Sequence, residues 1–442
     1  MMEREVGISQ CMIVKDEEDN IERALSWGKG IVSEQIVVDT GSTDRTVEIA
    51  KQMGANVYHF TWINDFAAAK NYALDKARYD WIIFLDADEY FLKEDAGKIL
   101  SYVKKLQDTP CSGILAKCLN VDREGNILTV VPELRIFRNL PELRYRGRIH
   151  EYIDFPQGKL LETLDAVEDL SVYHTGYSEE ALKKKDGRNL RLVQAELEHN
   201  PDDYRMLGYL GKEYMRMKEY VRAEDAFRRA LVLIPENMEG VYNGTTSEIG
   251  MRFLLLLVSE FSEREADVMD AYKQMTKRWP EESDYDYIMG QYFISKGDFR
   301  TGKIHLIRAI GLLGRYGYAE KAMLLSAEIK KAYELLVVCC YNNGDLVDCV
   351  SYATMMLKED PYLMGILKVM FLAFCRDGQT AKRDQDGAPE VLVFLKKIYD
   401  LQILKDRMFL LKAAQEARYE ALVKLLRGTF SQEELFVLDG KV

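Results

Sequence analysis

The first ninety or so residues alternate short apolar runs with amphipathic stretches, and this alternation restricts the possible folds more than any other feature of the chain. Strand-type runs stand at four places: GISQCMIV (7–14), EQIVVD (34–39), ANVYHF (55–60) and WIIFLDADE (81–89). Helix-type sequence separates them, near 19–29, after 42–44 and over 66–78. Such strand–helix alternation predicts an α/β, Rossmann-like domain whose sheet is mostly parallel and carries helices on both faces.

Polar residues follow three of the predicted strands, at 15–17, 39–43 and 86–88. Ligands of such sheets bind outside the carboxyl ends of the strands. We therefore expect these three polar segments to converge on one binding site.

The most specific of these segments is the Asp86–Ala87–Asp88 sequence directly after the apolar run WIIFL. A carboxylate beside a buried strand needs a compensating partner, because an unpaired buried charge is costly. Hard divalent cations such as Mg²⁺ and Mn²⁺ prefer carboxylate oxygens and usually keep substrate phosphates as further ligands. The pattern favours a metal–diphosphate site, and an acidic helix cap or a solvated loop is the alternative.

From about residue 200 the sequence becomes helical, with apolar residues at three- and four-residue spacing. The segment after 202 has the residue spacing of a tetratricopeptide repeat (TPR), in the positions Leu207, Gly211, Tyr214, Tyr220, Ala223, Phe227, Ala230 and Pro235. Two weaker copies follow, at 290–309 and 340–361, and an irregular helical bundle is the alternative. We predict a catalytic domain over 1–195 and a TPR-like all-α domain over 196–442, which would bind an acceptor or pair two subunits as a homodimer.

The composition excludes several classes of protein. A formal net charge of −12 argues against nucleic-acid binding, which needs a basic surface. The seven cysteines are scattered without CxxC spacing, as in a reduced compartment, and no signal peptide is recognisable. The most apolar later run, FLLLLV, is too short to span a bilayer. We expect a cytoplasmic protein without a stable membrane anchor.

Several blocks of the chain resemble, in order, those of a family 2 glycosyltransferase of GT-A fold: SQCMIVKDEEDNIERAL, IVVDTGSTDRTVEIAKQMGA, WINDFAAAKNYAL, WIIFLDADE, ELRIFRN, YRGRIHE, VYHTGYS and RNLRL. A GT-A domain followed by TPR repeats is similar to the layout of bacteriocin S-glycosyltransferases, including the sublancin enzyme. The resemblance implies an inverting enzyme, dependent on Mg²⁺ or Mn²⁺, that moves sugar from a UDP-sugar (UDP-glucose or similar) to a Cys, Ser or Thr side chain of a peptide or protein. A cell-envelope glycan or lipid-linked acceptor is one alternative, and a TPR scaffold with an inactive GT-A domain is another.

The resemblance also implies roles on the donor side. Glu17 and Asp39 fall where the family contacts uridine. Lys70 matches a position near the base and phosphates that is commonly arginine in relatives; a lysine keeps the charge but lacks the planar fork. Asp86 would face the ribose or the donor sugar.

A second group of residues is implied around the metal and the diphosphate. Asp88 would ligate the cation, and His174 in VYHTGY resembles the late histidine that completes the metal site; a structural hydrogen-bonding role is the alternative. Arg188, with Lys183 and Lys184, would close over the diphosphate, unless these residues form a solvated helix face.

The acceptor side needs a base for the proton of the nucleophile. Glu151 in RGRIHE matches a recurring acid of the subgroup and is the expected base, with Glu133 as the alternative. Arg135, Arg138 and His150 are expected to organise the acceptor side.

Overall fold

The computed structural model describes residues 6–122, 124–156, 161–176, 187–235, 244–317, 322–376 and 387–438. The chain divides into two compact units. The first comprises Met1–Glu282 with Tyr316–Ala327, and the second Ser283–Arg315 with Glu328–Val442. The first unit therefore contains the first repeat helices as well as the sheet, and the domain boundary after residue 195 stays a prediction.

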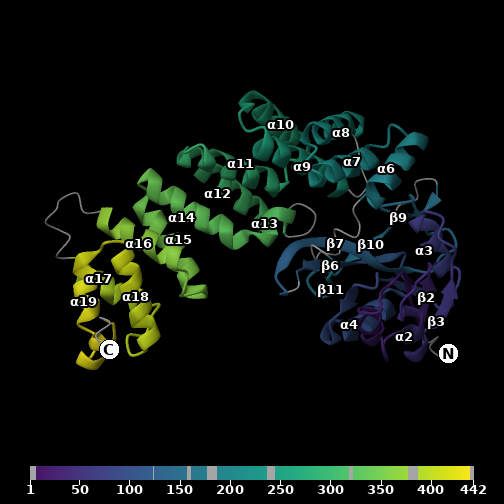
Figure 1. The fold of residues 1–442 in the computed structure, drawn as a ribbon, viewed down its shortest axis with the longest axis horizontal. Helices are drawn as coiled ribbons and strands as arrows, with labels where there is room; N and C mark the ends of the chain where they lie inside the picture. Colours follow the sequence, from purple (N-terminus) through teal and green to yellow (C-terminus); the bar gives the residue numbers. More distant parts are fainter. Residues whose placement is uncertain are drawn as a thin grey trace. The chain divides into compact units, whose positions relative to one another are not determined.

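A nine-stranded mixed sheet lies at the centre of the first unit (Figure 1). The strands are β1 (Ile8–Val14), β2 (Glu34–Asp39), β3 (Asn56–His59), β4 (Trp81–Phe84), β5 (Glu89–Phe91), β6 (Gly113–Val121), β7 (Ile127–Arg138), β10 (Thr163–Asp165) and β11 (Ser171–His174). Their order is β3-β2-β1-β4-β7-β6-β11-β5, with β10 beside β6. The strands β3, β2, β1 and β4 are parallel, whereas β7 is antiparallel to both β4 and β6. The predicted α/β fold class is confirmed, and the antiparallel β7 makes the sheet mixed.

The register of the parallel strands brings their carboxyl ends to one edge. Val14 at the end of β1 is paired with Asp39 at the end of β2, and Cys11 is paired with Phe84 at the end of β4. The segments that follow these three strands consequently leave the sheet side by side.

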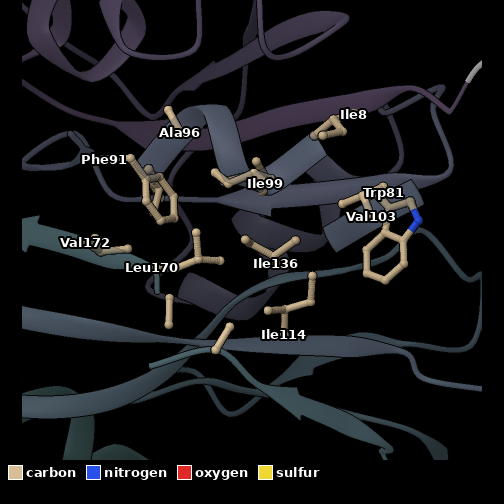
Figure 2. Close-up of a cluster of buried hydrophobic side chains, with 14 of the residues drawn as sticks. Ile8, Trp81, Phe91, Ala96, Ile99, Val103, Ile114, Ile136, Leu170 and Val172 are labelled. Atoms are coloured by element: carbon tan, nitrogen blue, oxygen red, sulfur yellow. The ribbon is translucent and has the colours of Figure 1, made fainter. Parts of the chain in front are cut away.

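Helices cover both faces of the sheet: α1 (Ile21–Ser26), α2 (Thr46–Gln52), α3 (Phe66–Leu74) and α4 (Lys93–Leu106). Successive side chains of β4 alternate between two hydrophobic clusters, as the period of a strand requires. Trp81 packs in the cluster that contains Ile99 and Val103 of α4, which Figure 2 shows in close-up. Phe84 packs in the cluster that contains Leu74 of α3. Burial on both faces explains why the β4 sequence is continuously apolar.

The strands β8 (Arg144–Arg146) and β9 (Tyr152–Asp154) form a separate two-stranded antiparallel sheet, and residues 147–151 connect them. Helices of the first unit follow: α6 (Arg188–His199), α7 (Tyr204–Arg216), α8 (Tyr220–Leu233), α9 (Gly244–Glu260), α10 (Glu265–Arg278) and, much later in the chain, α13 (Met323–Ala327), which packs against β7. In the pair α7–α8 a side chain on Gly211 would come within 2.6 Å of the Phe227 ring, so the predicted small residue permits close packing of the two helices.

The second unit is helical: α11 (Ser283–Ser295), α12 (Phe299–Tyr316), α14 (Ile329–Asn343), α15 (Leu346–Glu359), α16 (Met364–Arg376), α17 (Ala388–Leu395), α18 (Leu404–Glu416), α19 (Glu420–Arg427) and α20 (Gln432–Leu438). Its helices α11 and α12 repeat the close packing, since a side chain on Gly290 would lie 2.9 Å from Leu306. The predicted all-α repeat region is confirmed. Among the helices of the described ranges, none has the length and apolarity needed to cross a membrane.

Candidate functional site

A pocket of about 1180 Å³ opens in the first unit at the carboxyl ends of β1, β2 and β4. The segments predicted to converge contribute Lys15, Glu17, Thr40, Asp86 and Asp88 to its wall. The rest of the wall includes residues of β7, of the 149–154 segment and of helix α7. The predicted strand-end segments therefore meet at one cavity.

Lys70, on helix α3, joins two acids inside this pocket. Its Nζ lies 2.6 Å from Glu151 Oε1 and 3.4 Å from Asp86 Oδ1. The ammonium also lies 5.0 Å and 5.2 Å from the ring centres of Phe84 and Tyr145. Burial lowers the pKa of Lys70, but the charges of Asp86 and Glu151 outweigh burial and raise it above its ordinary value. Lys70 is thus a permanent cation between the expected donor side and the expected base.

The same charge keeps Asp86 ionised. Burial alone would raise the pKa of Asp86. The neighbouring charges of Lys70 and Arg135 have the larger effect and lower the pKa to about 2.

A second ion pair, Glu89 with Arg135, was not predicted from the sequence. It lies beside the turn that carries Asp86 and Asp88. The fully buried Glu89 accepts from Arg135 Nη2 at 2.6 Å and from the Asp86 backbone N–H at 3.1 Å. Burial raises the pKa of Glu89, and Arg135 only partly offsets this rise. Arg135 also lies 3.5 Å from Glu133 Oε2, so this pair of predicted acceptor-side residues is in contact. Residues 133–138 of the block ELRIFRN lie in β7, and its arginine among apolar residues was the available sign of a buried acidic partner.

Asp88 and His174 face each other at the end of β11. His174 Nε2 lies 3.4 Å from Asp88 Oδ2, and the other ring nitrogen, Nδ1, lies 2.8 Å from Asn120 Oδ1. The Asn120 amide is oriented by its donation to Thr129 Oγ1 at 2.7 Å, which presents its oxygen to His174. Burial lowers the pKa of His174, but the hydrogen bond and charge of Asp88 raise it overall.

Gly176, two residues after His174, leaves room for this pair. A Cβ on Gly176 would lie 2.0 Å from Asp88 Oδ2 and 2.8 Å from His174 Nε2. The glycine in VYHTGY thus leaves the space that the carboxylate and imidazole occupy.

Two overlapping sets of side chains could hold a metal ion. Glu89, Cys118 and His174 present ligand atoms within 4.8 Å of one another. Glu89, however, is already engaged by Arg135 and the Asp86 amide, and the Cys118 thiol is buried. Asp88 and His174 fit a cation better, because both line the pocket, whereas Glu89 and Cys118 do not. The hydrogen bond between His174 Nδ1 and Asn120 orients the ring as is typical of a metal-binding histidine.

The remaining donor-side residues lie in different environments. Glu17 lines the pocket and accepts from Asn20 Nδ2 at 2.8 Å. Asp39 does not belong to the pocket wall, since its carboxylate accepts from the backbone N–H groups of Ser42 and Gly41 at 2.9 and 3.3 Å. Burial raises the pKa of Asp39, and its hydrogen bonds, first those from Ser42, lower it overall. Asp39 shapes its own loop, and the adjacent Thr40 reaches the pocket.

Arg188, the first residue of α6, lies in the pocket wall over the Phe66 ring at 5.4 Å. Its guanidinium donates to Asn189 Oδ1, and burial lowers its pKa. Within the described ranges it has no carboxylate at ion-pair distance, so its charge is available to an anion. Lys183 and Lys184 lie outside the described residues.

His150 and Arg138, both expected on the acceptor side, are placed differently. The His150 ring lies in the pocket wall, stacked on Tyr209 of α7. Burial, and then the charge of Lys212, lowers the pKa of His150 to about 3. Arg138 does not reach the pocket: it stacks over Trp81 and donates to backbone carbonyls at and just beyond the end of α4, those of Leu106, Gln107, Thr109 and Cys111. Its position supports a structural function in place of the expected one.

The first part of the chain is similar to known proteins of one family. The model of glycosyl transferase family 2 matches residues 9–168. A TPR repeat-containing protein of Synechococcus elongatus is 33% identical over 214 residues, which are 46% of this chain and 51% of that protein. The SPbeta prophage-derived glycosyltransferase SunS of Bacillus subtilis is 29% identical over 224 residues, 50% of this chain and 52% of that protein. The chain thus spans about half the length of these curated relatives.

Among solved structures, Staphylococcus aureus TarS residues 1–349 match with a TM-score of 0.35 at 14% identity, over 62% of this chain and 91% of that one. The family model and the curated relatives support the family predicted from the sequence motifs: residues 9–168 match the glycosyl transferase family 2 model, and the chain resembles SunS and a TPR repeat-containing protein.

Proposed function

We propose that this protein is an inverting glycosyltransferase that uses a UDP-sugar and Mg²⁺ or Mn²⁺, and that it glycosylates a Cys, Ser or Thr side chain of a peptide or protein. One observation carries the proposal: in a chain whose residues 9–168 match family 2, the Asp88–His174 pair and the Asp86–Lys70–Glu151 cluster line the same pocket.

The donor would bind beside the strand-end acids. Asp88 and His174 would hold the cation, and Asn120 fixes the His174 ring so that Nε2 faces that position. When bound, the cation would neutralise the charge that develops on the diphosphate leaving group. Arg188 brings a charge without a carboxylate partner among the described residues to the same pocket, and Glu17 would accept a hydrogen bond from the nucleoside.

The acceptor would approach Glu151. The Oε1 atom of this carboxylate lies 2.6 Å from Lys70 Nζ, and Oε2 would accept the proton of the nucleophile. A thiol acceptor would demand less of this base than a hydroxyl, because its pKa is lower. One displacement at the anomeric carbon, assisted by one base, inverts the configuration of the sugar.

The volume of the pocket supports the simultaneous binding of two substrates. Its volume of about 1180 Å³ exceeds the ~300–1,000 Å³ of common small-molecule sites. A UDP-sugar and the acceptor side chain can therefore be bound together. Pairing of two chains through the helical region stays a separate prediction, which sedimentation would test.

Titration calorimetry with UDP, with and without Mn²⁺, tests the donor site. We expect wild-type protein to bind UDP more tightly with Mn²⁺ and Asp88→Ala to lose the metal-dependent part. Asp270→Ala is a matched control, because it removes an exposed carboxylate of α10 that accepts a hydrogen bond from Gln274 Nε2 at 2.7 Å. Failure of folded wild-type protein to bind UDP would favour the scaffold alternative.

A binding result would be followed by UDP-release assays with a panel of UDP-sugars. Acceptance of Cys- or Ser-containing peptides supports the proposal, and turnover only with glycan or lipid-linked acceptors would overturn its peptide part.

A further inference from the structure

Helix α7 contacts the residues on both sides of Glu151. Tyr209 stacks on His150, with ring centroids 3.4 Å apart and planes inclined by 5°. The Arg205 guanidinium lies 4.4 Å from the ring centre of Tyr152. Arg205 and Tyr209 are four residues apart and so occupy one face of the helix. One helical face therefore holds both sequence neighbours of the expected base.

These contacts belong to the pocket and not to a hydrophobic core. His150, Tyr152, Arg205 and Tyr209 all line the same cavity as Glu151. A stacked imidazole–phenol pair and a cation–π contact have defined geometries, so they fix orientation more narrowly than aliphatic packing does.

The segment that carries Glu151 needs such support. His150 has φ +51°, a left-handed conformation that residues with a side chain rarely adopt. Such conformations persist only where surrounding contacts impose them, and they cluster at functional sites. On its other side the segment is tied to α3, because the Phe66 N–H donates to the Arg148 carbonyl at 2.9 Å. Residues 148–152 are thus held between α3, which carries Lys70, and α7.

We propose that Arg205 and Tyr209 are positioning residues that clamp Glu151 against Lys70, so that the first repeat helix forms part of the active site. This inference rests on the proposed function, which makes Glu151 the base. Without the stack, the segment can relax from its left-handed conformation and the Glu151 carboxylate can leave Lys70.

Hydrogen exchange tests the clamp without any substrate. In Tyr209→Ala we expect the amides of residues 148–152 to exchange at least tenfold faster, whereas Tyr209→Phe, which keeps a stacking ring, stays within twofold of wild type. Arg205→Ala gives an independent reading if Tyr209→Ala does not fold. Arg222→Ala is the matched control, because it removes a cation–π contact of the same repeat, 4.1 Å above Tyr214. Unchanged exchange in both folded clamp variants would overturn the proposal.

A double-mutant cycle with Glu151→Gln separates positioning from substrate contact. The readout is Mn²⁺-dependent release of UDP from UDP-glucose. Tyr209→Ala should lower kcat at least tenfold with KM and UDP affinity within twofold, and it should lower kcat no further in the Glu151→Gln protein. Additive losses, or a loss in KM alone, would mean that α7 acts independently of Glu151 and would overturn the clamp.

The cycle also distinguishes failure of the clamp from failure of the proposed function. If Glu151→Gln leaves UDP release unchanged, the clamp has no base to position and is overturned, while metal-dependent UDP binding still supports the donor site. If wild-type protein neither binds UDP nor releases it from UDP-glucose, the proposed function fails, and the clamp fails with it.

Discussion

Lys70 Nζ lies 2.6 Å from Glu151 Oε1, although the two side chains are only 8% and 13% exposed. Removing two ions from water is costly, and a buried pair persists only when its geometry compensates for the lost hydration. Lys70 also reaches Asp86, so one ammonium holds an acid from the β4 end and an acid from the segment before β9.

Loss of Lys70 should destabilise the fold as well as the site. Lys70→Met would leave Asp86 and Glu151 facing each other without a cation, and we expect the free energy of unfolding to fall by about 3–5 kcal/mol. Urea denaturation measures the change. Lys98→Met, which removes an ion pair whose lysine is 46% exposed, should cost less than about 1 kcal/mol. Equal stability of Lys70→Met and wild type would contradict the prediction.

Gly176→Ala should damage metal binding specifically. The new Cβ would lie 2.0 Å from Asp88 Oδ2, so the carboxylate must move away from His174. We expect the Mn²⁺-dependent gain in UDP affinity to fall at least tenfold by calorimetry. Gly97→Ala is the control: its Cβ meets no atom within 4 Å, and within helix α4 alanine should stabilise by about 0.5–1 kcal/mol. An unchanged metal effect in Gly176→Ala would remove Asp88 from the metal site.

Asn120→Ala should weaken the binding of the cation, because Asn120 orients His174. The variant removes the acceptor 2.8 Å from Nδ1 and frees the imidazole to rotate. Loss of such outer contacts costs about 10–100-fold in metal affinity, which Mn²⁺ titration of the protein would measure. Asn126→Ala, in an exposed turn beside Asp122, should leave the affinity unchanged. If the two variants behave alike, His174 does not bind the metal.

Acidification should lower the stability of the fold through the buried side chain of His150. Its pKa is about 3 in the folded protein, chiefly through burial, against an ordinary value of 6.5. Between pH 6.5 and 3 the unfolded chain binds more protons at this residue, so stability falls as pH decreases through that range. His150→Phe keeps an aromatic ring against Tyr209 but does not titrate. Wild type should therefore lose more stability than His150→Phe between pH 7 and pH 5 in urea denaturation; parallel losses would contradict the assignment.

Much of the fold could be predicted from the sequence because local patterns determine it. The strands at 8–14, 34–39 and 81–84 follow from apolar runs, and their parallel register brings the strand-end acids to one edge. Most of the described site residues that the family motifs implied line the pocket.

Contacts between distant residues could not be predicted in the same way. Glu89 and Arg135 are 46 positions apart, and only the folded sheet shows that they form a pair. Asp39 has the right chemistry for a ligand, yet its loop conformation directs the carboxylate to backbone amides. The contacts of Arg205 and Tyr209 depend on how the first repeat packs against the segment around Glu151, for which the sequence has no local signal.

Helix α13 has a consequence for how the protein is made. It belongs to the first unit and packs on β7, and its Met323 lines the pocket, yet it follows the rest of that unit after a stretch assigned to the second. A chain emerging from the ribosome has completed Met1–Glu282 some 45 residues before Ala327 appears. At roughly 5–20 residues per second this interval lasts about 2–9 s, during which the β7 surface that receives α13 stays uncovered. The first unit therefore acquires its last helix, and Met323 its place in the pocket, only after part of the second unit has been synthesised.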